Sequence, residues 1–394
     1  MPRWELFSRG RGRAYDLTGG LPLSSFKGML RHLGVDAGVV ETPYTPEAFA
    51  RTDKGCGVVV HRDGLQVFSG LIASERSMGW DSERGKATIK VQVLGDNAHL
   101  ARRIVYPDPA RSGAAQSTLA YWTKSGAATS TAMLALISDQ LGPAARSERR
   151  VPGIYLAEDP GVGPARSWKF RFDNVLEALT KMSIASKANL GVRITTTPDG
   201  LRAAVYAPRN KADTIKFSAD LSNLHGFDYR QTAPEATYAL AGGKGDLTAR
   251  LLAEYTSAVG DDLAWGLRSE VFVDRTNEDD PAELAQAAAD TVTEGAGQTS
   301  LTCTLTDSQA ARYGLDWGPD PGDLVTVYVG LPGQTKVATV ADVVREIALQ
   351  VNNAGVETIR PAIGTDAATS KAPGLSAKRL AAVARRLATL ETRK

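Results

Sequence analysis

The pattern of apolar and polar residues predicts a β hairpin near residue 60. A valine run leads into an Asp-Gly dipeptide, which favours a tight two-residue turn because both positions tolerate positive φ. Further apolar residues follow directly, so the segment predicts two antiparallel strands. The residues that define this hairpin are Val58, Val60, Asp63, Gly64, Val67 and Phe68.

A longer alternating stretch follows the hairpin. Ile89, Val91 and Val93 alternate with polar residues, which gives the strand one packed face and one wet face. We expect such strands to form the wall of a β barrel. Residues 1–110 therefore predict an N-terminal β-barrel domain, with a short helix that Thr45 caps.

Helical periodicity replaces this alternation in the next section. Residues 129–141 carry apolar side chains on one helical face and are followed by Gly-Pro. A second amphipathic helix runs from Asp173, as its N-cap, to Ala188. A hairpin over residues 191–206 follows it. A helix followed by a hairpin predicts an α+β module over residues 111–220.

Residues 221–366 return to a mainly β pattern. Alternating strands flank a helix that the Asp-Pro pair at 280–281 introduces. In this section, as in the first, an alternating strand leaves a Gly-bounded turn, and longer strands end near an exposed Gly-Asp or Gly-Thr-Asp, at 95–96 and at 364–366. The pattern predicts a second β-rich section with a helical insertion, and the echo leaves open whether the chain is an internal duplication.

Residues 367–394 predict a linker and a C-terminal helix. The apolar residues of the helix have the a/d spacing of a coiled coil, over a length too short to be stable alone. The helix either folds back on its own domain or joins a parallel bundle about a symmetry axis, and the flexible linker favours the bundle. The residues assigned to oligomerisation are Leu380, Val383, Leu387 and Leu390.

These sections predict a mainly β protein with an α+β insertion: two β-rich sections, a helix–hairpin module between them and a C-terminal helix. The 394 residues, 43% of them hydrophobic, suit two to four globular domains. The net charge of +2 gives no overall case for nucleic-acid or membrane binding. The basic stretches at 9–13 and 146–150 are interpreted as solvated loops.

The chain lacks a signal peptide at its start and has no apolar run near the ~18 residues of a membrane helix. We therefore expect no membrane insertion and folding in a cytoplasm. Cys56 and Cys303 are the two cysteines, so the sequence predicts two small core residues and no disulfide framework.

Few residues form a catalytic pattern. His61, Asp63 and Ser69 fall in one hairpin, but a catalytic triad is defined by spatial roles that nearness in sequence does not supply. Residues 242–246 lack the Ser or Thr of a phosphate loop and indicate a turn between strands. The acidic residues 278–280 precede a helix, whose N-terminal dipole favours them.

The remaining histidines, His32, His99 and His225, lie far apart in the sequence, without the spacing of a metal site. We therefore predict a protein that is no enzyme and binds no cofactor or metal ion. Several β modules without a catalytic cluster, followed by an oligomerising helix, indicate a component of a larger assembly.

Segments of the chain resemble the phage baseplate hub proteins, the tail-associated hubs of long-tailed siphophages, which are akin to the central hub of contractile tails. The segment 62–70, with Arg-Asp-Gly before Phe-Ser-Gly, is similar to a hairpin in the N-terminal barrel of that family. The helix–hairpin of residues 173–206 and the closing strand 357–361 are also similar. The resemblance spans roughly residues 10 to 366.

This resemblance implies a homotrimer. It also implies that residues 1–110 and 221–366 are two tube-type β-barrel domains, the second with a helical insertion. Two such domains per chain would give a ring with pseudo-sixfold symmetry, which joins the hexameric tail tube and distal tail protein to threefold parts of the tip. The ring would close the tail channel, meet the C-terminus of the tape measure protein, and open so that DNA can pass.

The same resemblance implies a place at the distal tip of the virion's tail, after assembly in the host cytoplasm. A downstream tip or fibre protein would follow the C-terminal helix, and DNA would be met only in transit. Because the chain ends after a short helix, we expect cell-wall hydrolysis and host recognition to belong to other proteins.

Two alternatives stay open. A carbohydrate-binding module or hydrolase built on β barrels would have a polar pocket and act as a monomer. The hub of a contractile injection system or of a gene transfer particle would share the hub architecture but serve another machine.

Overall fold

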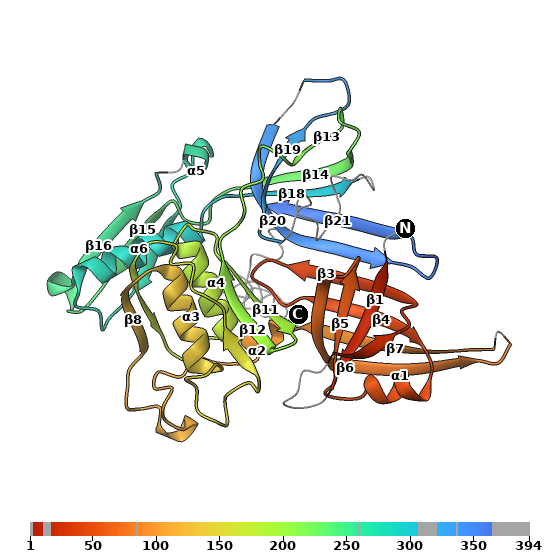
Figure 1. Cartoon of the computed structure of the whole chain (residues 1–394). Coiled ribbons are helices and arrows are strands. Elements are labelled where there is room, and N and C mark those ends of the chain that lie inside the picture. Colours follow the sequence, from red (N-terminus) through yellow and green to blue (C-terminus); the bar gives the residue numbers. More distant parts are fainter. Residues whose placement is uncertain are drawn as a thin grey trace, which may run out of the picture.

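The computed structural model describes residues 3–10, 17–83, 85–258, 260–305, 321–335 and 338–364. Within these residues the chain is mainly β, with a mixed α+β part between two β-rich parts (Figure 1), so the predicted fold class is confirmed. The largest sheet has 13 strands and runs through both β-rich parts.

The first β unit contains the predicted hairpin. Its elements are β1 (Trp4–Arg9), β2 (Leu17–Leu21), β3 (Ser25–Arg31), β4 (Ala37–Pro43), α1 (Pro46–Arg51), β5 (Gly57–Arg62), β6 (Leu65–Asp81) and β7 (Lys86–Gly95). The strands pair in the order β3-β4-β7-β6-β5-β1-β2. Ile89, Val91 and Val93 are buried, which confirms the predicted packed face of β7. Thr45 caps α1, as expected, by accepting a hydrogen bond from the amide of Ala48.

The second β unit repeats this strand order. Its elements are β13 (Lys216–Ser218), β14 (Leu224–Thr232), β18 (Gln298–Leu305), β19 (Leu324–Val329), β20 (Ala338–Val351) and β21 (Glu357–Gly364). The pairs β14-β18-β21-β20-β19 match β3-β4-β7-β6-β5 strand for strand. The echo in the sequence therefore corresponds to two units of one topology, with β7 and β21 in equivalent places.

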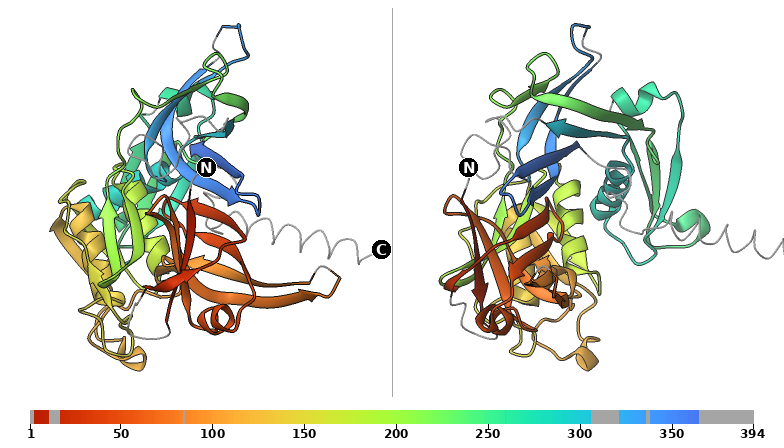
Figure 2. Two further views of the ribbon diagram at one scale, coloured as in Figure 1. Left: turned by 45° about the vertical axis from the view of Figure 1, so that its right-hand side comes forward. Right: turned by 90° about the vertical axis from the view of Figure 1, so that its right-hand side faces the viewer.

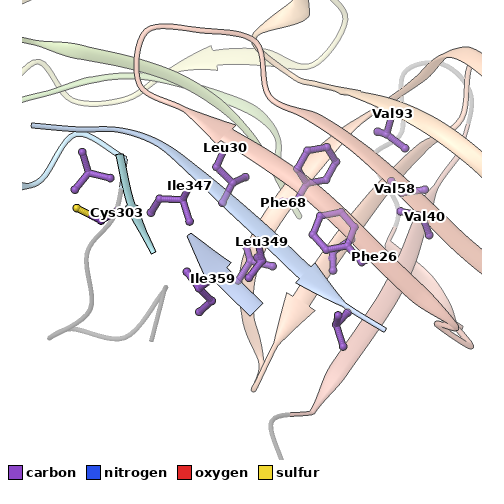
Figure 3. Packing of buried hydrophobic residues seen from close by; sticks show 14 of the residues in the cluster. Phe26, Leu30, Val40, Val58, Phe68, Val93, Cys303, Ile347, Leu349 and Ile359 are labelled. Carbon is purple, nitrogen blue, oxygen red and sulfur yellow. The ribbon is translucent and has the colours of Figure 1, made fainter. Parts of the chain in front are cut away.

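The two β units share one sheet. In the pairing of the described strands neither unit closes on itself; β3 of the first pairs instead with β20 of the second, and the path of the sheet ends at β14 and β2. One hydrophobic core also spans both units, from Phe26 and Phe68 to Ile347 and Ile359 (Figure 3). The units are therefore packed as one body.

The helix–hairpin module has its own core, which runs from Leu100 to Val205. Its elements are α2 (Ala98–Ala101), a 3₁₀ turn (Gly113–Ala115), β8 (Trp122–Ala127), α3 (Thr129–Gln140), β9 (Ile154–Leu156), β10 (Arg166–Phe170), α4 (Val175–Ala185), β11 (Gly191–Thr197) and β12 (Gly200–Tyr206). The predicted helix, helix and hairpin are present. The domain boundaries at 110, 220 and 366 stay predictions.

The predicted cap of α4 is wrong by one residue. Asn174 caps the helix, because its side chain accepts hydrogen bonds from the amides of Leu176 and Glu177. Asp173 accepts a hydrogen bond from the amide of Arg171 instead. Both residue types suit this position, so the sequence pattern alone did not separate them.

The connection between β14 and β18 is a folded insertion. It contains β15 (Tyr238–Gly242), a 3₁₀ turn (Leu247–Ala249), β16 (Leu252–Thr256), α5 (Gly260–Ala264), β17 (Glu270–Asp274) and α6 (Pro281–Glu294). Asp280 caps α6, as expected. The strands form a separate sheet, β16-β15-β17, and α6 packs on it through Leu284, Ala288 and Val292. The sequence prediction had counted these strands with the second barrel.

Candidate functional site

The hairpin singled out in the sequence lies in the wall of the first β unit. β5 and β6 pair antiparallel, and Asp63 and Gly64 make the turn with φ of 51° and 80°, the left-handed values that a type I′ turn requires. Val58 and Val60 are fully buried, and Val67 and Phe68 are buried too. The ring of Phe68 packs 5.4 Å from that of Phe26, between centroids. These residues build the core.

The candidate triad does not come together. The hydroxyl of Ser69 donates a hydrogen bond to Asp96 Oδ2 at 2.6 Å. The carboxylate of Asp63 accepts a hydrogen bond from the backbone amide of Arg3. The ring of His61 packs on that of Phe7, with centroids 4.9 Å apart. Each side chain has a structural partner elsewhere, so the hairpin supplies no nucleophile–base pair.

The other candidate motifs also have structural partners. Lys244 forms an ion pair with Asp279 at 3.1 Å, and Glu278 accepts a hydrogen bond from Lys169. Within the described ranges no group of three or more His, Cys, Asp or Glu residues could hold a metal ion. Both cysteines are buried and free, and burial raises the pKa of Cys303 to about 12.

A buried ionic network joins the first β unit to the helix–hairpin module. Arg9 Nη2 lies 2.6 Å from Asp96 Oδ1, and the two side chains are 1% and 0% exposed. Asp96 Oδ2 accepts from the hydroxyls of Ser69 and Thr196, and Arg9 Nη1 donates to Thr196 Oγ1. Breaking a buried ion pair is costly because it leaves one charge without its counter-charge, so this network ties β11 to β1 and to the residue that follows β7.

Two predictions are wrong at this network. The sequence predicts that Arg9 lies in a solvated basic loop and that Asp96, after β7, is exposed. Both side chains are buried because each supplies the counter-charge that the other needs. Arg149 in the second basic stretch is likewise buried; it donates to the carbonyl of Ile104 and lies over the ring of Tyr106.

Asn97 adds neutral hydrogen bonds to the same junction. Its amide nitrogen donates to the carbonyls of Gly34 and Val192, and its amide oxygen accepts from the backbone amide of Ile194. A single side chain thus bridges the turn after β3 and strand β11. The sequence gave no local signal for this role, because the partners lie far apart along the chain.

Ion pairs also join the two β units to each other. Arg62 at the end of β5 meets Glu357 at the start of β21 at 2.8 Å, with side chains 5% and 4% exposed. Arg31 on β3 meets Glu346 on β20 at 2.8 Å, beside the paired strands. Together with the shared sheet, these contacts set the angle between the two β units.

His32 links the turn after β3 to the helix–hairpin module. Its ring nitrogens lie 3.1 Å from the hydroxyl of Tyr206 and 3.2 Å from the carbonyl oxygen of Asn189. Burial and the nearby charges of Arg345 and Arg193 lower the pKa of His32 to about 3. The imidazole is therefore neutral at physiological pH and acts as a structural bridge.

Beyond these junctions, the end of the β6–β7 ribbon projects from the body (Figure 2). We name residues 76–91 the arm. Met78 and Trp80 on the arm are 54% and 74% exposed, and Tyr44 nearby is 40% exposed. Met78 and Trp80 are two positions apart on one strand and so lie on the same face of the sheet. Exposed apolar side chains that lie together are typical of an interaction surface, so the arm is the candidate assembly site of the first β unit.

The predicted oligomerisation residues Leu380, Val383, Leu387 and Leu390 lie outside the described residues, and their role stays a prediction. None of the described helices has the length and apolar character needed to cross a membrane.

Comparison with known proteins is consistent with a phage tail origin. The family model of Siphovirus ReqiPepy6 Gp37-like proteins matches residues 14–365. No curated protein sequence matches the chain.

Solved structures share the fold over almost the whole chain. The 43 kDa tail protein of prophage MuSo2 from Shewanella oneidensis is 12% identical, with a TM-score of 0.53 over 92% of this chain and 98% of that one. A tail protein from Neisseria meningitidis MC58 is 16% identical, with a TM-score of 0.54 over 92% and 97%. Prophage tail protein gp18 from Listeria monocytogenes EGD-e is 11% identical, with 0.52 over 97% and 99%.

Proposed function

Because the chain belongs to the family of Siphovirus ReqiPepy6 Gp37-like proteins, a family of phage tail proteins, we propose that it is the structural hub at the distal tip of a siphophage tail. Copies of the chain form a trimeric ring that joins the tail tube and the distal tail protein to the tip. The ring meets the C-terminus of the tape measure protein, closes the channel, and opens for DNA to pass.

The observation that carries this proposal is the repeated strand order of the two β units. Strands β3-β4-β7-β6-β5 and β14-β18-β21-β20-β19 have one topology and share one sheet. A threefold ring of such chains would present pairs of similar β units all round its axis. That arrangement suits a protein that connects a sixfold tube to a threefold tip.

The side chains favour a structural role over a catalytic one. The candidate catalytic and phosphate-binding residues of the sequence have structural partners, and the buried charges join modules. Rigid junctions suit a part that transmits force along a tail. We therefore assign the chain no reaction and no cofactor.

The C-terminal helix would continue the threefold axis of the ring as a parallel bundle. In this proposal the a/d stripe is the contact between copies, and a downstream tip or fibre protein follows it. The stripe consists of Leu380, Val383, Leu387 and Leu390.

Light scattering tests the trimer. We expect the full chain to have three times the mass of one chain, and a variant ending at residue 366 to have a weaker tendency to associate. Leu380→Ser combined with Leu387→Ser should weaken the trimer, whereas Arg385→Ala combined with Arg386→Ala, off the stripe, should leave it intact.

A full chain that stays monomeric at high concentration would contradict the hub. Gold-labelled antibodies on particles that carry the protein test its place: label at the far end of the tail supports the proposal, and label on the capsid or along the tube contradicts it. Mass and position together also separate a hub from a monomeric carbohydrate-binding module.

A further inference from the structure

The two β units can be superposed residue by residue through their strand pairing. In the first unit Gly28, Gly38, Val93 and Ile72 form one row across β3, β4, β7 and β6. The register shift between β7 and β6 follows this row, at Ile72/Arg76, and the register shift between β21 and β20 follows one row of the second unit in the same way, at Val344/Glu346. We therefore match these two rows. Across β14, β18, β21 and β20, the members of the second row are Tyr229, Leu301, Ile363 and Val344.

This common row assigns an equivalent to each arm residue. Four positions before Val93 along β7, Ile89 pairs with Met78 on β6. Four positions before Ile363 along β21, Ile359 pairs with Leu349 on β20. Met78 is therefore equivalent to Leu349.

Two positions before Ile89 on β7, Ala87 pairs with Trp80. Two positions before Ile359 on β21, Glu357 pairs with Val351. Trp80 is therefore equivalent to Val351. The arm is the counterpart of the end of β20, although β6 carries extra residues in a bulge before it.

The equivalent residues have opposite exposure. Leu349 and Val351 are 1% and 4% exposed, whereas Met78 and Trp80 are 54% and 74% exposed. The difference has a visible cause: β3 pairs along this part of β20, with Gly28 opposite Leu349 and Phe26 opposite Val351. Along the arm, β6 pairs with β7 on one edge, and none of the described strands pairs with its other edge. The arm therefore has apolar residues like those of the β20–β3 junction, but no strand in the described part of the chain pairs with its outer edge.

The missing neighbour has a counterpart in the second β unit. In the common row Tyr229 of β14 takes the place of Gly28 of β3, and two positions earlier Phe227 takes the place of Phe26. Strand β14 pairs with β18 on one edge and, among the described strands, ends the path of the sheet. Among the described strands the outer edge of β14 has no partner, whereas the equivalent edge of β3 pairs with β20.

We propose that the arm of one copy pairs antiparallel with β14 of a second copy, and so repeats between chains the β20–β3 junction that each chain makes within itself. The register places Trp80 opposite Phe227 and Met78 opposite Tyr229. The apolar side chains of the arm then meet aromatic rings, as in the core of the junction within the chain. This proposal rests on the ring proposed above and names the surface through which its copies join.

A second copy is the partner because the arm and β14 are not neighbours within one chain. Seven strand-to-strand steps separate β14 from β6 in the sheet order, and the two strands belong to different β units. In Figure 1, β14 lies in the upper β unit, and the arm projects from the lower one. Every copy therefore offers one arm and one β14 edge, the head-to-tail arrangement that generates closed rings.

The alternation of hydrogen-bonded and non-hydrogen-bonded pairs between β3 and β20 shows which positions suit a disulfide between copies. The amide of His32 donates to the carbonyl of Arg345 at 2.7 Å, so alternate pairs of this ladder are hydrogen-bonded and Lys27 with Gln350 is a non-hydrogen-bonded pair. The equivalent pair between copies is Asp228 with Gly79. Their Cβ atoms would be close enough for a disulfide.

The test is oxidative cross-linking of Gly79→Cys combined with Asp228→Cys in the full chain. A Cβ at Gly79 would meet only Thr88 Oγ1, at 4.0 Å, and Asp228 is exposed, so both changes suit the fold. The matched control is Gly79→Cys with Thr232→Cys, which lies four positions out of register. Denaturing gels without reductant then measure the linked fraction.

We expect at least about tenfold more covalently linked chains from the matched pair than from the control, since a disulfide tolerates little displacement. Mixing the Gly79→Cys and Asp228→Cys single variants should give linked dimers only. If light scattering shows an oligomer but the matched and control pairs form equal amounts of disulfide, the proposed arm–β14 interface is wrong, and the proposed hub function is not contradicted. A monomer with neither pair linked would contradict both proposals.

Discussion

Arg62 and Glu357 form a buried ion pair, 2.8 Å between Nε and Oε2, that connects the hairpin of the first β unit to the last strand of the second. The two residues are 295 positions apart in the chain. Their contact lies beside the shared β3–β20 pairing, so strand hydrogen bonds and a paired charge together hold one angle between the units.

Removing one member of this pair should be costly. Arg62→Met leaves the Glu357 carboxylate buried without its counter-ion, and we expect a loss of about 3–5 kcal/mol in the free energy of unfolding, measured by urea denaturation. The double variant with Glu357→Met should recover much of the loss.

Arg3→Ala is the control for that experiment, because the Arg3 side chain that pairs with Glu5 is 79% exposed. Breaking such a surface pair should cost at most about 1 kcal/mol. Equal losses for Arg3→Ala and Arg62→Met would contradict a special role for the buried pair.

Asp96→Asn tests the network between the first β unit and the helix–hairpin module. The substitution keeps the shape but leaves the Arg9 guanidinium without the carboxylate 2.6 Å away. We expect a loss of several kcal/mol and faster hydrogen exchange in β11, whose Thr196 belongs to the network. Exchange that rises equally in the insertion, remote from the network, would argue against a local junction.

His32→Gln should flatten the acid side of the stability profile. The pKa of His32 is lowered to about 3 in the fold, against about 6.5 in an unfolded chain. The folded state therefore binds fewer protons between these values, and its stability is full above about pH 6.5 and falls as the pH drops towards 3, by up to about 1.4 kcal/mol per pH unit. Urea midpoints from pH 7 to pH 4 measure the effect; parallel profiles for the two proteins would refute it.

Asp36→Asn should act in the opposite direction. Burial raises the pKa of Asp36 to about 6, against the ordinary 3.8. The folded state therefore holds a proton that the unfolded state releases, and stability falls as the pH rises from about 4 to 6. The variant keeps an acceptor for the amide of Arg31, so it should gain up to about 2–3 kcal/mol over the parent above pH 6.

The gain should vanish below pH 4, where both forms of residue 36 are neutral. Asp213→Asn, at an exposed position, serves as the control and should follow the parent across the range. A gain for Asp36→Asn that is independent of pH would point to packing and not to the buried charge.

Met78→Ser combined with Trp80→Ser should weaken association and leave folding unchanged, since both side chains are largely exposed. Aromatic anchors of an interface carry much of its energy, so we expect the dissociation constant to rise by about tenfold or more. Leu247→Ser, at a side chain 95% exposed in the insertion, is the control. If sedimentation gives the same dissociation constant for the arm variant and for Leu247→Ser, the arm is not part of the interface.

Local patterns predicted the local structure well. Alternation identified β7, the Asp63-Gly64 dipeptide identified its turn, and Thr45 marked the start of α1. These features depend on neighbours along the chain, which a sequence displays directly. The one-residue error at Asn174 arose because two adjacent residues both suit a helix cap.

Long-range features were missed for a physical reason. Nothing near Arg9 shows that Asp96 and Thr196 will neutralise and bind it, and nothing near β14 shows that the next strands belong to a separate sheet under α6. The pairing of β3 with β20 has no local signal either. The equivalence of Phe26 and Phe227 does have a sequence signal, because the two units repeat one pattern of strands.

The β3–β20 pairing also sets the order in which the protein can be completed. Arg31 and Glu346, which face each other across it, are 315 positions apart, so a ribosome making ~5–20 residues per second needs roughly 15 s to 1 min to get from one to the other. Throughout that time strand β3 has β4 on one side and no partner on the other. A nascent chain with an open strand edge can join its neighbours on the same message, so the timing of synthesis becomes a condition for correct assembly.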